Sequence, residues 1–168
     1  RVLPQDRGDR DHLLTHEAAK YIANAMAYDD VIRVADLKTR APRFERIRGE
    51  MGVRAANLMQ LTEYLHPRAE EIAGLLPARL GAKIAADPVW MARLDRWFNK
   101  GRHLRTDSLR GFLMLHVVGA LRGWRRRTLR HAQEVAHLEA WLAATMAHLP
   151  ANYDLAVEVL RSRRLIKG

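Results

Sequence analysis

Apolar residues recur at intervals of three and four along most of this chain, and this spacing constrains the fold more than any other feature. Such spacing places apolar side chains on one face of an α-helix. No stretch shows sustained alternation of apolar and polar residues, and no Asn-Gly or Asp-Gly pair marks a hairpin. We therefore expect an all-α fold, a single helical bundle of about seven to eight helices.

Capping residues, prolines and glycines divide this pattern into segments. Thr15 is placed to cap a helix over residues 16–39, and Pro42 opens a shorter one that stops near residues 49–52. Residues 53–66 fit either a helix or an extended linker. The later segments expected to be helical are 67–74, 80–87, 88–98, 109–121, 124–148 and 153–160.

Two of these segments carry expectations about burial. Residues 109–121 are apolar almost all round, which is typical of a central, buried helix. His116 lies within this segment, so we expect it to be a polar group satisfied in the core. Trp90 and Trp97 belong to the apolar face expected for residues 88–98.

Composition limits the chemistry that these residues can carry. The chain contains no cysteine, which excludes disulfides, thiol catalysis and thiolate-held iron–sulfur clusters here. Its 29 Lys and Arg outnumber its 19 Asp and Glu, giving a net charge of +10. A field of this sign attracts nucleic acid, phosphorylated ligands such as coenzyme A, anionic lipid or an acidic protein. No apolar run is long enough to span a membrane, so we expect a cytoplasmic protein.

The sharpest basic cluster lies in residues 121–131. Five arginines stand within nine residues beside Trp124: Arg122, Arg125, Arg126, Arg127 and Arg130. Such a cluster could clamp phosphates while the indole stacks on a base or adenine. Alternatively, it is a junction between two helices whose arginines are solvated or pair with acidic residues elsewhere. A second basic group, Arg43, Arg46, Arg48 and Arg54, is too scattered to name a ligand.

A charged stripe runs along the first long segment. Asp29, Arg33, Asp36 and Arg40 alternate in sign at spacings of four, three and four, which predicts a ladder of ion pairs. Each such pair contributes about 0.2–0.5 kcal/mol on an exposed helix. The alternative is a buried network that locks this helix against a partner domain. Both interpretations assign the stripe an architectural role rather than a catalytic one.

No catalytic or metal-binding constellation is predicted. His12 and His16 stand four apart beside Glu17, but no third metal ligand is defined. The sequence has no Walker loop, no dinucleotide-binding glycine motif, no Ser-His-Asp arrangement with local context and no Gly-Asp-Gly start of a thiamine diphosphate site.

Three stretches of the chain resemble one protein family. They are residues 28–40 (YDDVIRVADLKTR), residues 61–77 (containing LTEYLHP and EEIAGLLP) and residues 163–168 (RRLIKG). In this order they resemble the helical C-terminal part of the beta subunit of indolepyruvate ferredoxin oxidoreductase. The resemblance implies a parent enzyme that oxidatively decarboxylates aryl 2-oxo acids to acyl coenzyme A. Thiamine diphosphate and iron–sulfur clusters, carried elsewhere in that enzyme, would pass the electrons to ferredoxin.

From this resemblance we expect residues 1–168 to form one helical domain excised from a larger oxidoreductase subunit, with residues 1–14 as a polar N-terminal segment. The expected function is non-catalytic packing against the thiamine-dependent catalytic domain or subunit. In a sharper form, the basic face centred on residues 122–130 receives an acidic electron carrier such as ferredoxin, or the phosphates of coenzyme A. The alternative is a helical nucleic-acid-binding domain, favoured by the charge and the Trp-Arg cluster. The spread of basic residues over several helices disfavours it.

Overall fold

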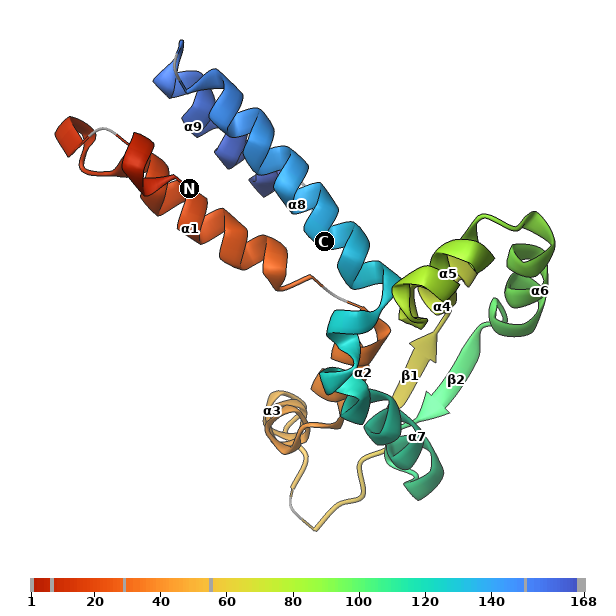
Figure 1. Ribbon diagram of the computed structural model, residues 1–168. Helices are drawn as coiled ribbons and strands as arrows, with labels where there is room; N and C mark the ends of the chain where they lie inside the picture. The colour runs from red at the N-terminus through yellow and green to blue at the C-terminus, as the bar shows by residue number, and fades with distance from the viewer. Residues whose placement is uncertain (1, 7, 29, 55, 150, 166–168) are drawn as a thin grey trace. The chain divides into compact units, whose positions relative to one another are not determined.

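The computed structural model describes residues 2–6, 8–28, 30–54, 56–149 and 151–165 (Figure 1). Among these residues it contains nine α-helices and one small two-stranded sheet, so the prediction of an all-α fold is confirmed. The chain divides into two compact units: unit 1 is Arg1–Tyr28 with Gln133–Gly168, and unit 2 is Asp29–Ala132. Each unit has its own core, and the single domain over residues 1–168 stays a prediction.

Unit 1 is built from the two ends of the chain. Its helices are α1 (Leu13–Met26), most of α8 (Leu129–His148) and α9 (Tyr153–Arg161), with short 3-10 helices η1 (Leu3–Gln5), η2 (Gly8–Arg10) and η5 (Ser162–Leu165). Helix α9 packs against α1 and runs alongside α8 (Figure 1), where Trp141 Nε1 donates a hydrogen bond to the Val159 carbonyl at 3.0 Å. The core residues are Val2, Leu14, Ala18, Leu149, Tyr153, Ala156, Val157 and Leu160.

Helix α1 starts differently from the prediction, since it begins at Leu13 and Thr15 does not cap it. The Asp6 carboxylate accepts hydrogen bonds from the Thr15 backbone N–H at 2.8 Å and from its hydroxyl at 2.6 Å. The Tyr153 hydroxyl accepts a bond from the Leu14 N–H at 3.1 Å and donates to Asp6 at 2.7 Å. Side chains from outside the helix therefore satisfy first-turn N–H groups that a local cap would otherwise serve.

The single helix predicted over residues 16–39 is wrong, because it is broken into α1 and α2 (Val31–Thr39). Asp30 is the N-cap of α2, and its Oδ1 accepts a hydrogen bond from the Arg33 N–H at 2.7 Å. An aspartate that bonds the backbone in this way favours the start of a helix over its interior.

Unit 2 contains the remaining helices and both strands. The helices are α2, α3 (Ala41–Glu50), α4 (Ala69–Leu75), α5 (Ala78–Ala85), α6 (Pro88–Phe98) and α7 (Leu109–Ala120), followed by 3-10 helices η3 (Leu121–Gly123) and η4 (Arg125–Arg127). Strands β1 (Thr62–Leu65) and β2 (Arg102–Arg105) pair antiparallel, with Glu63 opposite Leu104 and Tyr64 opposite His103. Residues 53–66 were left open by the sequence; those that the structure describes contain a strand and no helix.

Helix α7 packs closely on α2, and Gly119 lies at this contact. Its buried positions are Gly111, Leu115 and Gly119, and a Cβ at Gly119 would lie 2.9 Å from the backbone of Asp36. The prediction that residues 109–121 form a central, buried helix is therefore wrong. His116 is exposed and stacks on Phe112 with 5.7 Å between ring centroids, so its predicted core role is wrong as well. None of the described helices combines the length and apolar character needed to cross a membrane.

Candidate functional site

Charge is distributed unequally between the two units. Unit 1 contains eight Lys and Arg and eight Asp and Glu, whereas unit 2 contains 21 basic and 11 acidic residues. The whole net charge of +10 therefore belongs to unit 2, and any electrostatic attraction of an acidic partner acts mainly through that unit.

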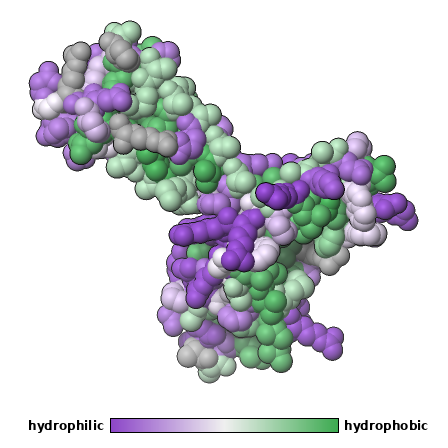
Figure 2. Space-filling view, viewed as in Figure 1, coloured by the Kyte–Doolittle hydropathy of each residue, from purple (hydrophilic) through white to green (hydrophobic). Residues whose placement is uncertain are grey.

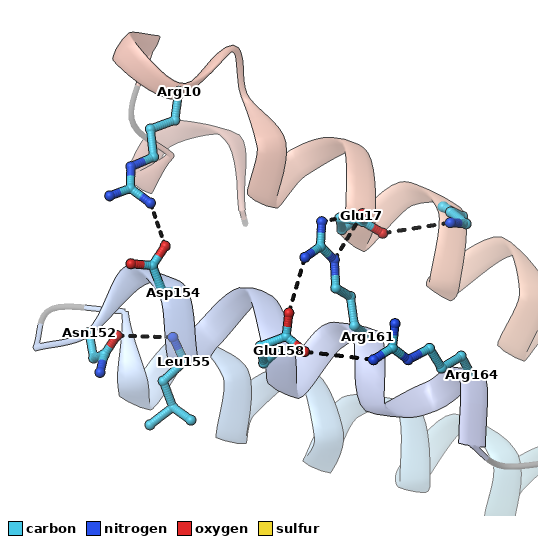
Figure 3. Close-up of polar contacts among 9 residues, drawn as sticks. Arg10, Glu17, Asn152, Asp154, Leu155, Glu158, Arg161 and Arg164 are labelled. Carbon is cyan, nitrogen blue, oxygen red and sulfur yellow. Dashed lines mark hydrogen bonds and ion pairs between the residues drawn. The ribbon is translucent and has the colours of Figure 1, made fainter.

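In unit 1 the charged side chains pair with one another (Figure 3). Arg161 lies 3.0 Å from Glu17 of α1 and 3.0 Å from Glu158 of its own helix, and Arg10 pairs with Asp154. Asn152 caps α9 by accepting a hydrogen bond from the Leu155 N–H at 3.0 Å. The Arg161–Glu17 pair joins α9 to α1 and the Arg10–Asp154 pair joins η2 to α9, which are structural roles.

Four apolar residues of α7, and Leu121 directly after it, are exposed. We call Leu109, Leu113, Met114, Val117 and Leu121 the α7 outward face. Their exposed fractions are 80%, 53%, 45%, 57% and 48%, respectively. Figure 2 shows hydrophobic surface over α7, next to hydrophilic surface over the η3 and η4 segment. Residues spaced by four share one side of a helix, so this face forms a continuous apolar stripe.

The burial pattern of α7 is the inverse of a core helix. Gly119 lies against α2, where the short distance leaves no room for a Cβ, and Gly111 lies against the Arg105 backbone, whereas the large side chains of the α7 outward face are exposed. A contiguous exposed apolar patch on a soluble domain marks an interaction site more often than chance exposure does. Burying a Leu or Val side chain there would contribute about 1.5–3 kcal/mol per residue.

The basic cluster after α7 is divided by the structure. Arg125 is half-buried and its Nε lies 2.5 Å from Asp30 Oδ2, so this arginine ties η4 to the start of α2. Arg127 stands over the Trp124 ring, 5.3 Å from its centroid. The side chains of Arg122, Arg126 and Arg130 are exposed, as is Trp124. Arg125 thus has an architectural contact, and the other members present their side chains to solvent.

The predicted charged stripe is partly present. Arg40 Nη2 lies 2.5 Å from Asp36 Oδ2, which is the predicted pairing at a spacing of four. Asp29 lies outside the described residues. Its neighbour Asp30 accepts a hydrogen bond from the Arg33 N–H at the start of α2 and pairs with the Arg125 side chain of η4. Both contacts link parts of unit 2, in agreement with an architectural role.

A buried carboxylate that the sequence did not single out organises α2, α3 and β1. Glu63 is buried on β1, and its two oxygens pair with Lys38 of α2 and Arg43 of α3. Burial alone would raise the pKa of Glu63, but the hydrogen bond from Lys38 and the charges of Lys38 and Arg43 outweigh it. The pKa therefore lies below the ordinary value for glutamate. Successive side chains of a strand point to opposite faces, so the exposed Tyr64 implies that its neighbour Glu63 points inward. No other local feature of the sequence indicates the burial of Glu63.

Next to this carboxylate, a groove of about 590 Å³ lies between α2 and α3. Its walls combine apolar and cationic side chains: Val34, Leu37, Lys38, Arg40, Pro42, Arg43 and Arg46. Helix α3 begins beside it without a side-chain cap and without an acidic residue in its first turn. Arg43 and Arg46, which looked scattered in the sequence, are brought together here with Lys38 of α2 and with Arg40, which lies between the two helices.

The tryptophans of α6 are exposed, so their predicted place on the apolar, packed face is wrong. The packed part of that face carries Met91, Leu94 and Phe98, whereas Trp90 and Trp97 lie beside it with exposed fractions of 42% and 55%. The Arg93 guanidinium stands 5.1 Å from the centroid of the Trp90 ring. In the sequence, the two tryptophans and the residues Met91, Leu94 and Phe98 all stand at helical spacing. The packing of α6 against α4 decides which of these side chains are buried.

A family model described as "Family of unknown function (DUF6537)" matches residues 1–168. No curated protein and no solved structure matches the chain.

Proposed function

Since the chain belongs to this family of unknown function, we propose a role from its surfaces: it is a non-catalytic helical module of a larger cytoplasmic oxidoreductase. In this role it packs against the thiamine-dependent catalytic domain or subunit of the same enzyme. The observation that carries the proposal is the α7 outward face. The resemblance to indolepyruvate ferredoxin oxidoreductase supports the choice of parent enzyme.

The dimensions of the α7 outward face suit helix packing. Helix α7 has 12 residues, and a helix rises 1.5 Å per residue, so the stripe is about 18 Å long. The apolar side chains are bordered by Arg110 and His116, both exposed. An apolar centre with a polar rim is the usual anatomy of a protein–protein interface.

The basic segment extends this surface toward an acidic partner. Arg122, Arg126 and Arg127 are exposed and follow directly after Leu121, so they continue the stripe at its C-terminal end. We assign to them the docking of an acidic electron carrier such as ferredoxin, or of the phosphates of coenzyme A. Arg125 is left out of this set because it pairs with Asp30.

Co-purification tests the packing role. The chain is mixed with the thiamine-dependent subunit, and wild type is compared with a Leu113→Asp/Val117→Asp variant. Leu58→Asp is the matched control, since Leu58 is 99% exposed and lies outside α7. Wild type and control should retain the subunit and the double variant should lose it. Retention by the double variant would overturn the proposal.

Salt dependence tests the basic segment. Charge reversal at Arg126 and Arg127 should slow association with ferredoxin, and the wild-type rate should fall as ionic strength rises. An unchanged rate would remove ferredoxin docking from the proposal while leaving the packing role intact.

A nucleic-acid-binding function is the second candidate. It is favoured by the exposed Trp90 and Trp124, each with an arginine over its ring. A titration against random duplex DNA distinguishes it. Binding whose logarithm falls linearly with the logarithm of salt, with a slope of several units, would support nucleic acid. Absence of binding at low salt would eliminate this candidate.

A further inference from the structure

We propose that the groove between α2 and α3 binds a small amphiphilic anion, a molecule with a phosphate or carboxylate head group and an apolar body. This goes beyond the packing role, because the groove lies on α2 and α3 and shares no residue with the α7 outward face.

The charge of the groove favours an anion. Four cationic residues line it, and the carboxylates that pair with them are Glu63, Asp36 and Glu50. Four positive charges against three negative ones leave one positive charge in excess. A guanidinium has five N–H donors, of which Arg43 uses one on Nη2 for Glu63 and one on Nη1 for the Lys38 carbonyl at 3.4 Å. Donors therefore remain for an incoming oxyanion.

Two of the cations are already fixed before any ligand arrives. Lys38 and Arg43 are largely buried and share the carboxylate of Glu63, which holds both side chains in one arrangement. Ordering a long cationic side chain opposes binding, and here the fold has already ordered it. Arg46 completes the wall with a freer side chain, since its contact with Glu50 is 3.6 Å long and both groups are exposed.

The apolar part of the wall selects an amphiphile over a simple ion. Val34, Leu37 and Pro42 lie beside the cations in the same groove. The volume of about 590 Å³ falls within the range of about 300–1,000 Å³ that is common for small-molecule sites. An aryl or acyl body against these side chains adds apolar burial to the contacts of its charged head.

An NMR titration of the ¹⁵N-labelled chain with 1-naphthyl phosphate, 1-naphthoate and inorganic phosphate tests the proposal. The two naphthyl probes distinguish a phosphate from a carboxylate head. We expect amide shifts to change mainly in residues 34–46, and at least one naphthyl anion to bind about tenfold or more tightly than inorganic phosphate. Shifts confined to α6 or α7, or no advantage of either naphthyl anion, would overturn it.

Substitutions locate the anion. Arg46→Gln should weaken binding about tenfold, a loss that corresponds to one charge-assisted hydrogen bond. Arg79→Gln makes the same charge change at an exposed position of α5 and should leave affinity unchanged. Arg46 is 69% exposed in its side chain, so its loss does not threaten the fold. Equal affinity of the two variants would overturn the proposal.

Arg43→Gln provides a second variant, measured together with thermal unfolding because it leaves Glu63 with one partner fewer. Folded Arg43→Gln should bind the naphthyl anion more weakly than Arg46→Gln does. Equal or tighter binding would contradict the proposal that the groove is the anion site. The packing role is tested separately, by whether the Leu113→Asp/Val117→Asp variant still co-purifies with the thiamine-dependent subunit. Anion binding in the groove and packing through α7 can therefore fail independently.

Discussion

The two units of this chain handle their charges and apolar side chains in opposite ways. Unit 1 balances eight basic against eight acidic residues and buries Leu14 and Leu160 in its core. Unit 2 holds the whole excess of positive charge and exposes the α7 outward face. Unit 1 therefore carries no net charge, whereas unit 2 presents the cationic and apolar side chains on which the proposed roles rest.

Matched leucine truncations give the largest expected contrast. Leu160→Ala should lower the free energy of unfolding by about 3 kcal/mol, because Leu160 is fully buried in the core of unit 1. Leu113→Ala on α7 should cost less than about 0.5 kcal/mol, since that side chain is largely in solvent. Denaturant unfolding measures both. Similar losses at the two positions would break the comparison.

Removing the Glu63 carboxylate should come next in size. Glu63→Gln leaves Lys38 and Arg43 without their shared carboxylate, and we expect a loss of about 2–3 kcal/mol, reduced from the fully buried case because both cations retain some exposure. Chemical denaturation near pH 7 checks this value. A loss below about 0.5 kcal/mol would mean that the cations do not depend on Glu63.

The pH dependence of the free energy of unfolding tests the ion pairs of Glu63 in a second way. The folded pKa of Glu63 is lowered, so its stabilising contribution is complete above the unfolded value of about 4.3 and is lost as pH falls through the folded pKa. Wild type should therefore lose more stability than Glu63→Gln in this acidic range. Parallel pH profiles of the two proteins would contradict the assignment.

The close contact of α7 with α2 predicts a smaller effect. Gly119→Ala places a Cβ 2.9 Å from the Asp36 backbone and should destabilise the protein by about 1–2 kcal/mol. Gly123→Ala is the matched control, because a Cβ there meets nothing within 4 Å. Thermal unfolding should separate the two variants. Equal melting temperatures would show that the contact between α7 and α2 tolerates a Cβ at position 119.

The smallest effect concerns the polar start of α1 in unit 1. Tyr153→Phe removes the acceptor of the Leu14 N–H and a donor to Asp6, and should cost about 1 kcal/mol. Hydrogen exchange at the Leu14 amide should accelerate in the variant. Unchanged exchange at that amide would show that the tyrosine does not support the helix start.

The sequence predicted what depends on local pattern and missed what depends on distant neighbours. Periodicity located the later helices, and the spacing of Asp36 and Arg40 predicted their ion pair. It could not tell which face of α7 is buried, because that depends on how closely α2 approaches. The four-residue strands are too short to show alternation.

The candidate site illustrates the same limit. The basic cluster of residues 122–130 was visible as a run, but the pairing of Arg125 with Asp30 spans 95 positions and has no local signal. Glu63 gathers Lys38 and Arg43 from 25 and 20 positions away. Only the folded unit brings these charges together and creates the groove beside them.

Oxidative footprinting of methionines shows whether the α7 outward face is covered in the complex, because Met114 belongs to that face. Met26 of unit 1 and Met51 of unit 2 are exposed outside that face and serve as internal controls. Oxidation rates are measured for the chain alone and in the presence of the thiamine-dependent subunit. We expect the thiamine-dependent subunit to protect Met114 strongly from oxidation, with little change in the oxidation rates of Met26 and Met51. Oxidation of Met114 at the same rate in both samples would contradict this expectation.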